Sequence, residues 1–252
     1  MSLLTDKRKL IAQTNTLAIA SVVEITNLLQ DRSVPELAYQ LRLTLPPVAE
    51  QFSSVAATVS TQYYADARVQ ARVASEYVAR PFVPDVDPVV QSSIGYAISR
   101  LTVDNNYGTF QSILAGSIQR VVSDGDRLTV EDNIDRDPDG QLFERVASGN
   151  ACAFCLTMAA VSELQRSSEA SDYHNFCQCT VRAVFTGQKP FDRNEYKVAR
   201  EAYSLAGSEL QTRRDEVGYL DLPRSQRLKQ YPELALNTKN HLRLVREITG
   251  WK

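Results

Sequence analysis

Apolar residues recur at helical spacing near the start of the chain. Successive intervals of 7, 4, 3 and 4 residues place one set of them on a single face of a helix. These residues are Ile11, Ala18, Val22, Ile25 and Leu29. A second apolar set lies off this face and comprises Leu10, Leu17, Val23 and Leu28. A helix that is apolar on more than one side tends to be buried on more than one side, either within its own chain or against another one.

Helix breakers divide the N-terminal region. The run Asp31-Arg32-Ser33 and then Pro35 are expected to end the first helix and begin the second. Pro46-Pro47 is expected to bend or restart that second helix. From Val48 to Val78 the sequence is rich in Ala, Val and Gln and has few breakers, which again favours a helix. Residues 1–80 are therefore predicted to form a helical hairpin or a small bundle.

Residues 81–140 are predicted to combine a linker, helices and an acidic loop. The proline-rich joint at 81–88 is expected to be extended, and the apolar patterns at 89–100 and 110–122 predict two helices. Between Asp124 and Gly140 the sequence becomes acidic and loses its periodicity. The first half of a calcium-binding loop is recognisable there, but Val146 stands where that loop needs a glutamate. We therefore interpret this stretch as a solvated loop.

Residues 141–190 have the pattern of a small α+β unit. Strands are predicted at 142–146 and 180–185, with a short helix at 152–164 between them. Residues 191–252 are predicted to form C-terminal helices. The two helices expected in this last region are 193–217 and 224–250.

The composition of the chain is that of an ordinary globular protein. It has 252 residues, of which 43% are hydrophobic and 23% charged, with a formal net charge of -2. No stretch approaches the length of apolar sequence needed to span a bilayer. No export signal is visible either, because polar residues interrupt the segment after Lys9. Residues 182–252 carry 14 Lys/Arg against 9 Asp/Glu, a bias typical of a solvated helical face or of a surface that contacts a partner.

The four cysteines and one of the two histidines lie within 28 positions. The group comprises Cys152, Cys155, His174, Cys177 and Cys179. A Cys-x-x-Cys pair brings two thiolates to one turn, and a second group some 20 residues later supplies the other corners of a tetrahedron. We interpret the group as the binding site of one structural zinc ion per chain. Which four of the five bind stays open, and buried thiols or a disulfide are the alternatives.

The same residues offer little for catalysis. A closed zinc site stabilises a fold, whereas a catalytic zinc keeps one position open. A nuclease of the HNH type would need a further histidine close downstream, yet the other histidine, His241, lies 67 residues after His174. Zinc deaminases carry a His-x-Glu motif that is absent here. The protein is therefore expected not to be an enzyme, and a metal-dependent hydrolase is the alternative.

Two stretches carry a more specific resemblance. They read RVASGNACAFCLTMA over 145–159 and YHNFCQCTVRAVF over 173–185. They resemble the MuF-type minor capsid proteins of tailed phages, in the version found in phages of actinobacteria. Residues 160–164 depart from the family pattern, so the loop between the two halves of the motif is expected to have its own shape. The N-terminal helices match the family in layout only.

The resemblance implies a structural component of the phage head. Such a protein is made in the host cytoplasm, assembles with the portal protein and the major capsid protein, and contacts no membrane. Some relatives are labelled head morphogenesis or maturation protease proteins, but a serine protease needs a nucleophile, a base and an orienting group in contact. With two histidines in the chain, the sequence gives a protease no support of its own. The basic C-terminal region offers non-specific contact with packaged DNA.

The expected fold is thus mostly α. Long N-terminal helices precede a small zinc-stapled α+β unit, and C-terminal helices follow it.

Overall fold

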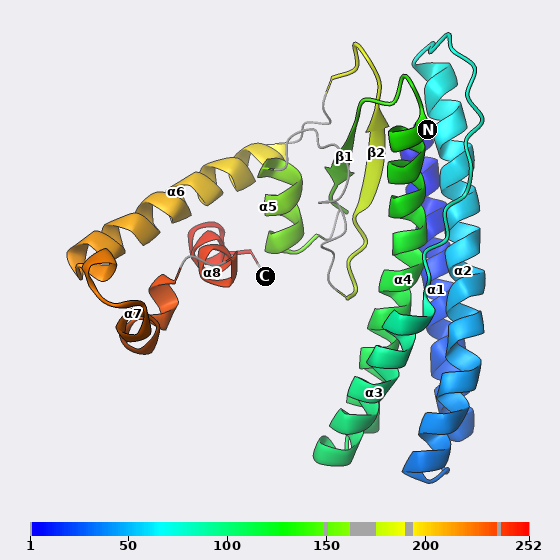
Figure 1. The fold of residues 1–252 in the computed structure, drawn as a ribbon, viewed down its shortest axis with the longest axis horizontal. Helices are drawn as coiled ribbons and strands as arrows, with labels where there is room; N and C mark the ends of the chain where they lie inside the picture. Colours follow the sequence, from blue (N-terminus) through cyan, green and yellow to red (C-terminus); the bar gives the residue numbers. More distant parts are fainter. Residues whose placement is uncertain (1, 149–150, 162–174, 190–193, 236–237, 252) are drawn as a thin grey trace. The chain divides into compact units, whose positions relative to one another are not determined.

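The computed structural model describes residues 2–148, 151–161, 175–189, 194–235 and 238–251. The chain divides into two compact units, one of residues 1–146 and 164–190 and the other of residues 147–163 and 191–252. In the described residues it forms eight α-helices, two short 3-10 helices and one two-stranded sheet (Figure 1). The predicted fold class, mostly α with a small sheet, is confirmed. Among these described helices, none is both long enough and apolar enough to cross a membrane.

The first unit is built around one long central helix, α4. Helix α4 packs against the three other helices of this unit and also contacts both strands. Figure 1 shows α1 and α2 running alongside α4 for most of its length. The bounds are α1 Leu3–Leu29, α2 Val34–Gln70, α3 Asp87–Asp104 and α4 Tyr107–Arg136.

Helix α1 has the two apolar faces that the sequence predicts. Ser2 caps its first turn, since the Ser2 hydroxyl accepts a hydrogen bond from the Thr5 amide. Ile11, Ala18 and Val22 are buried in the core of the unit. The leucines of the second face point away from this core and are exposed in this structure. Their exposed fractions are 47% for Leu10, 60% for Leu17 and 76% for Leu28.

Helix α2 continues through Pro46 and Pro47 without a restart. A proline inside a helix leaves the carbonyl four residues earlier without its usual donor. For Pro46 that carbonyl belongs to Arg42, and the side-chain amide of Gln91 in α3 donates to it at 3.3 Å. A neighbouring helix therefore replaces the hydrogen bond that the proline removes.

Helix α2 is shorter than predicted. The expected helical run to Val78 is wrong, because the helix ends at Gln70. Arg72 takes a left-handed conformation with φ 56°, which terminates helical geometry.

The segment after α2 runs along α4 in an extended form, as predicted for the joint. Two polar side chains of α4 bind its backbone as a neighbouring strand would. Asn133 donates to the Arg80 carbonyl at 2.7 Å and accepts from the Arg80 amide at 2.9 Å. Thr129 makes the same pair of bonds with Phe82, at 3.0 and 3.1 Å.

The expected acidic loop from Asp124 to Gly140 is wrong over most of its length. Helix α4 begins at the Asn106 cap, whose side chain accepts from the Thr109 amide at 2.9 Å, and it continues to Arg136. Helical periodicity does persist here, as a row of residues four apart interrupted by a single acid, Asp126. The buried apolar members of this row are Ile118, Val122, Val130 and Ile134.

The two predicted strands are confirmed and pair with each other. Strand β1, Leu142–Val146, is antiparallel to β2, Thr180–Val184, with Leu142 opposite Val184 and Val146 opposite Thr180. Four of the five residues in each strand are buried, so both faces of this small sheet are covered. The sheet contacts α4, which brings the start of β2 to the middle of that helix.

The second unit consists of helices around its own small core. Its elements are α5 Ala153–Val161, α6 Asn194–Glu216, η1 Tyr219–Asp221, α7 Arg224–Gln230, η2 Pro232–Leu234 and α8 Thr238–Thr249. The predicted continuous helix over 224–250 is wrong, because α7 ends before Pro232 and that proline opens a 3-10 turn. The core of this unit includes Ala206, Leu210 and Val245.

Replacing Gly125 by alanine is expected to destabilise the first unit. A Cβ at this position of α4 would lie 2.5 Å from the Ser53 carbonyl oxygen of α2, so the two helices would have to separate. We expect unfolding to become easier by about 2 kcal/mol or more, despite the higher helix propensity of alanine. Urea denaturation followed by circular dichroism measures it.

The matched control is Gly108→Ala, in the exposed first turn of α4, where the nearest atom would be 3.5 Å away. It is expected to leave the stability equal or slightly raised. Equal stability of the two variants would show that α2 and α4 are not in close contact at Gly125.

Candidate metal centre

Three of the predicted metal ligands lie together. The Sγ atoms of Cys155, Cys177 and Cys179 are all within 4.8 Å of one another, and all three residues are buried. None of the four cysteines, all of which are among the described residues, forms a disulfide. Three buried cysteines this close together can hold a metal ion.

The spacing of these sulfur atoms fits a tetrahedral thiolate site. Zinc–sulfur bonds of about 2.3 Å place two ligand sulfurs roughly 3.8 Å apart in a tetrahedron. The observed limit of 4.8 Å allows this with a small adjustment of side chains. Soft thiolate ligands favour zinc over the hard cations that prefer oxygen.

Of the other two predicted ligands, Cys152 is among the described residues and His174 is not. Cys152 is half-buried and immediately precedes α5, and its carbonyl accepts the first helical hydrogen bond, from the Leu156 amide at 3.0 Å. His174 lies outside the described residues. The remaining histidine, His241, is in α8, where its Nε2 atom is 2.8 Å from the Tyr203 carbonyl and its ring stacks on that tyrosine.

Cys177 and Cys179 form one half of the centre, in the turn that leads into β2. Both are buried while Gln178 between them is exposed. This is the alternation predicted for residues two apart in extended chain. The Cys179 amide is 3.5 Å from the Cys177 sulfur and donates to it. Such an N–H···S bond favours the charged thiolate, because a hydrogen bond to the charged form stabilises it.

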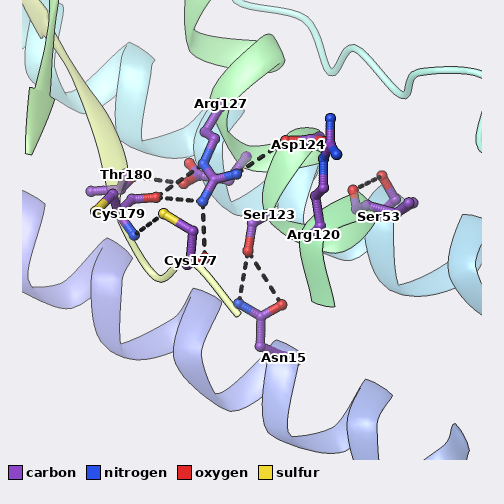
Figure 2. Close-up of polar contacts among 11 residues, drawn as sticks. Asn15, Ser53, Arg120, Ser123, Asp124, Arg127, Cys177, Cys179 and Thr180 are labelled. Atoms are coloured by element: carbon purple, nitrogen blue, oxygen red, sulfur yellow. Dashed lines mark hydrogen bonds and ion pairs between the residues drawn. The ribbon is translucent and has the colours of Figure 1, made fainter. Parts of the chain in front are cut away.

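The turn is held by a buried arginine of α4. The Arg127 guanidinium donates to the Cys179 carbonyl from Nε at 3.0 Å and from Nη2 at 2.9 Å, and to the Cys177 carbonyl from Nη2 at 3.0 Å. Its Nη1 is 3.0 Å from a carboxylate oxygen of Asp124. Figure 2 shows Arg127 reaching from α4 to the backbone of this turn, with Asp124 on its other side.

The two residues that precede Cys177, Asn175 and Phe176, also contact α4. The Asn175 side chain donates to the Ser117 hydroxyl at 3.4 Å. Phe176 has a left-handed backbone, φ 63°, and its ring covers Gly116, where a Cβ would come within 2.6 Å of the ring. Glycine at position 116 therefore leaves the space that the aromatic ring occupies.

The residues after Cys179 are tied to α1, α2 and α4 through one carboxylate. Asp126 accepts from the Thr180 hydroxyl at 2.6 Å and from the Ser60 hydroxyl at 2.5 Å. It also pairs with Lys7 of α1 at 2.7 Å, with both side chains 1% exposed. Lys7 then donates to the Val181 carbonyl at 2.8 Å. The first two residues of β2 thus bind α4 and α1 directly, and Asp126 links them to Ser60 of α2.

Burial shifts the ionisation of the charged groups behind the turn. Burial lowers the pKa of Lys7, and the nearby Asp126 carboxylate opposes this shift. Burial likewise raises the pKa of Asp124, while Arg127 and Arg120 oppose the change. The ion pairs are what keep charged groups tolerable at this depth.

The supporting residues were not predicted from the sequence. Asp124, Asp126 and Arg127 fall in the stretch interpreted as a solvated loop, and no role was predicted for Lys7. The row of buried residues four apart around Asp126 was the available signal. An acid in such an apolar row must find a partner when the helix is buried.

Comparison with known proteins places the chain among viral gene products. A family model described as VG15 protein matches residues 2–206, which include all of the cysteines and all but the first residue of the first unit. No curated protein and no solved structure matches the chain.

Replacing Lys7 by methionine is expected to lower the free energy of unfolding by roughly 3 kcal/mol, because the change leaves a buried carboxylate without its counter-charge. Chemical denaturation at neutral pH measures it. The control is Arg32→Met, which removes the ion pair with Glu36 whose side chains are 57% and 45% exposed. That change should cost at most about 0.5 kcal/mol. A loss equally small for Lys7→Met would contradict the buried pair.

Replacing Cys177 by serine is expected to remove the bound metal. Elemental analysis of protein purified under reducing conditions should find about one zinc per wild-type chain and far less in the variant. The variant should also melt at a lower temperature, since metal binding contributes to folding. Gln178→Ser, in the same turn but exposed, is the control and should keep the metal. Wild-type protein without metal would refute a metal centre at these cysteines.

Proposed function

We propose that this chain, which belongs to the VG15 protein family, is a structural minor capsid protein of a tailed phage. The family is one of viral gene proteins, so the chain is a phage protein. The observation that carries the finer proposal is the motif over 145–185, three of whose four cysteines lie together in this structure. The chain is assembled in the host cytoplasm and becomes part of the phage head.

In this proposal the metal is one structural zinc ion per chain. Cys155, Cys177 and Cys179 supply three ligands, and Cys152 or His174 supplies the fourth. The burial of the three thiols supports a structural ion, because a catalytic zinc needs an open position and access for substrate. The proposal assigns no catalytic role to the chain.

The partners we propose are the portal protein and the major capsid protein. Support comes from α1, whose outer leucines are exposed although its other face is buried. Leu10 and Leu17 are seven residues apart and so lie on one side of the helix. Apolar side chains repeated on one exposed side are typical of a surface that packs against another helix.

The decisive experiment asks where the protein is found. Mass spectrometry of purified virions, and of heads separated from tails, should detect it in the head. Co-expression with the portal protein, followed by size-exclusion chromatography, should give a complex of the two. Absence from purified virions would contradict the head assignment and would leave the metal centre untouched.

Replacing Leu17 by glutamate is expected to weaken the complex with the portal or capsid protein by about tenfold or more, because a charge then enters an apolar contact. The variant should fold normally, since Leu17 is 60% exposed. Binding is measured by titrating the variant against the purified partner. Ala12→Glu adds the same charge at an exposed position on a different side of α1 and should bind as wild type does. Equal binding by both variants would show that the outer leucines of α1 do not form the contact.

A further inference from the structure

We infer that Arg127 is a positioning residue for the metal centre, one that holds the Cys177–Cys179 turn in a metal-ready shape without binding the metal itself. This inference rests on the proposed zinc site. It concerns how the site is preformed, and it assigns to α4 a role that the cysteine motif alone does not reveal.

The geometry of the guanidinium carries the inference. One group, 1% exposed in its side chain, binds the carbonyls of both cysteines through three hydrogen bonds. When two carbonyls that are two residues apart converge on one planar group, the peptide planes between them are fixed. Both cysteine side chains then leave the turn on the same side, while Gln178 faces solvent.

The guanidinium is itself held in place. Asp124, one turn before it on α4, binds Nη1 at 3.0 Å, so Nε and Nη2 are directed to the turn. Arg120 is 3.8 Å from the same carboxylate but is 41% exposed and lies on the far side of Asp124 from the turn (Figure 2). Arginine suits this task because it offers several N–H donors in a fixed fork, which lysine cannot reproduce.

The arrangement has two consequences for a bound cation. A turn that is already fixed does not have to be ordered when the metal binds, so less of the binding free energy is spent on ordering. In addition, three or four thiolates around a divalent ion leave net negative charge, and a buried guanidinium on the same turn offsets part of it. Groups that orient the ligands of a metal typically contribute about 10-fold to 100-fold to its affinity.

The test is a cobalt(II) titration of the full-length, reduced protein, in competition with a chelator. Cobalt stands in for zinc, because its thiolate charge-transfer absorption reports the sulfur ligands directly. Arg127→Lys keeps the positive charge but loses the fork, and Arg127→Met loses both. We expect the dissociation constant for cobalt to rise about 10-fold to 100-fold in each, with Arg127→Met the weaker binder.

Two controls separate positioning from stability. Arg120→Met removes the exposed arginine beside the same Asp124 and should bind cobalt within about threefold of wild type, since it makes no bond to the turn. Val90→Ala opens a cavity at a fully buried site of α3 and lowers stability without touching the turn. Its cobalt affinity, measured well below its melting temperature, should also stay within about threefold of wild type. A merely structural Arg127 would behave like Val90.

Each outcome has a distinct meaning. If wild-type protein binds no cobalt, the proposed zinc site fails. If wild type binds and Arg127→Lys binds equally well, the site stands and the inference about Arg127 is wrong. Should Arg127→Met not fold, Asp124→Asn offers a milder route, because it keeps the size of the side chain but loosens the guanidinium. That variant is expected to bind cobalt about 3-fold to 10-fold more weakly, and unchanged affinity in it would also overturn the inference.

Discussion

The first unit depends on the burial of one carboxylate, that of Asp126 in the middle of α4. An ion at this depth is tolerated only when every oxygen finds a donor or an opposite charge. Lys7 of α1, Ser60 of α2 and Thr180 of β2 supply these partners. Elements from the beginning and the end of the unit's sequence are thereby fixed around one point, and apolar packing alone would not specify their register so narrowly.

The next residue along α4, Arg127, fixes the turn that holds two of the cysteines. Arg127 faces the turn that precedes β2, while Asp126 holds the start of the strand itself. Closer to the N-terminus of the same helix, the Phe176 ring covers Gly116 and the Asn175 side chain donates to the Ser117 hydroxyl. The segment 175–180 is therefore held by side chains of one helix, and its shape depends on α4 as well as on its own sequence.

The sequence predicted the elements whose patterns are local. The two faces of α1 and the two strands follow from spacing alone, and the gathering of Cys155, Cys177 and Cys179 follows from their clustering. The errors occurred where tertiary contacts override composition. Acids such as Asp126 were taken as a sign of solvent because their partner, Lys7, is more than a hundred residues away. No local rule gives Arg42 its replacement donor from Gln91 either.

The hydrogen bonds that fix the cysteine turn are also relevant to the proposed function. A catalytic centre needs a ligand position or a titratable group that can meet a substrate. Here the buried arginine beside Cys177 and Cys179 is engaged by two carbonyls of the turn and by Asp124. Its hydrogen bonds to the chain itself make the turn rigid, which is what a scaffold requires. On α1 of the same unit, Leu17 and Leu28 are exposed apolar side chains. A turn fixed in this way, together with exposed leucines on α1, is consistent with the proposal that the chain is a part of an assembly.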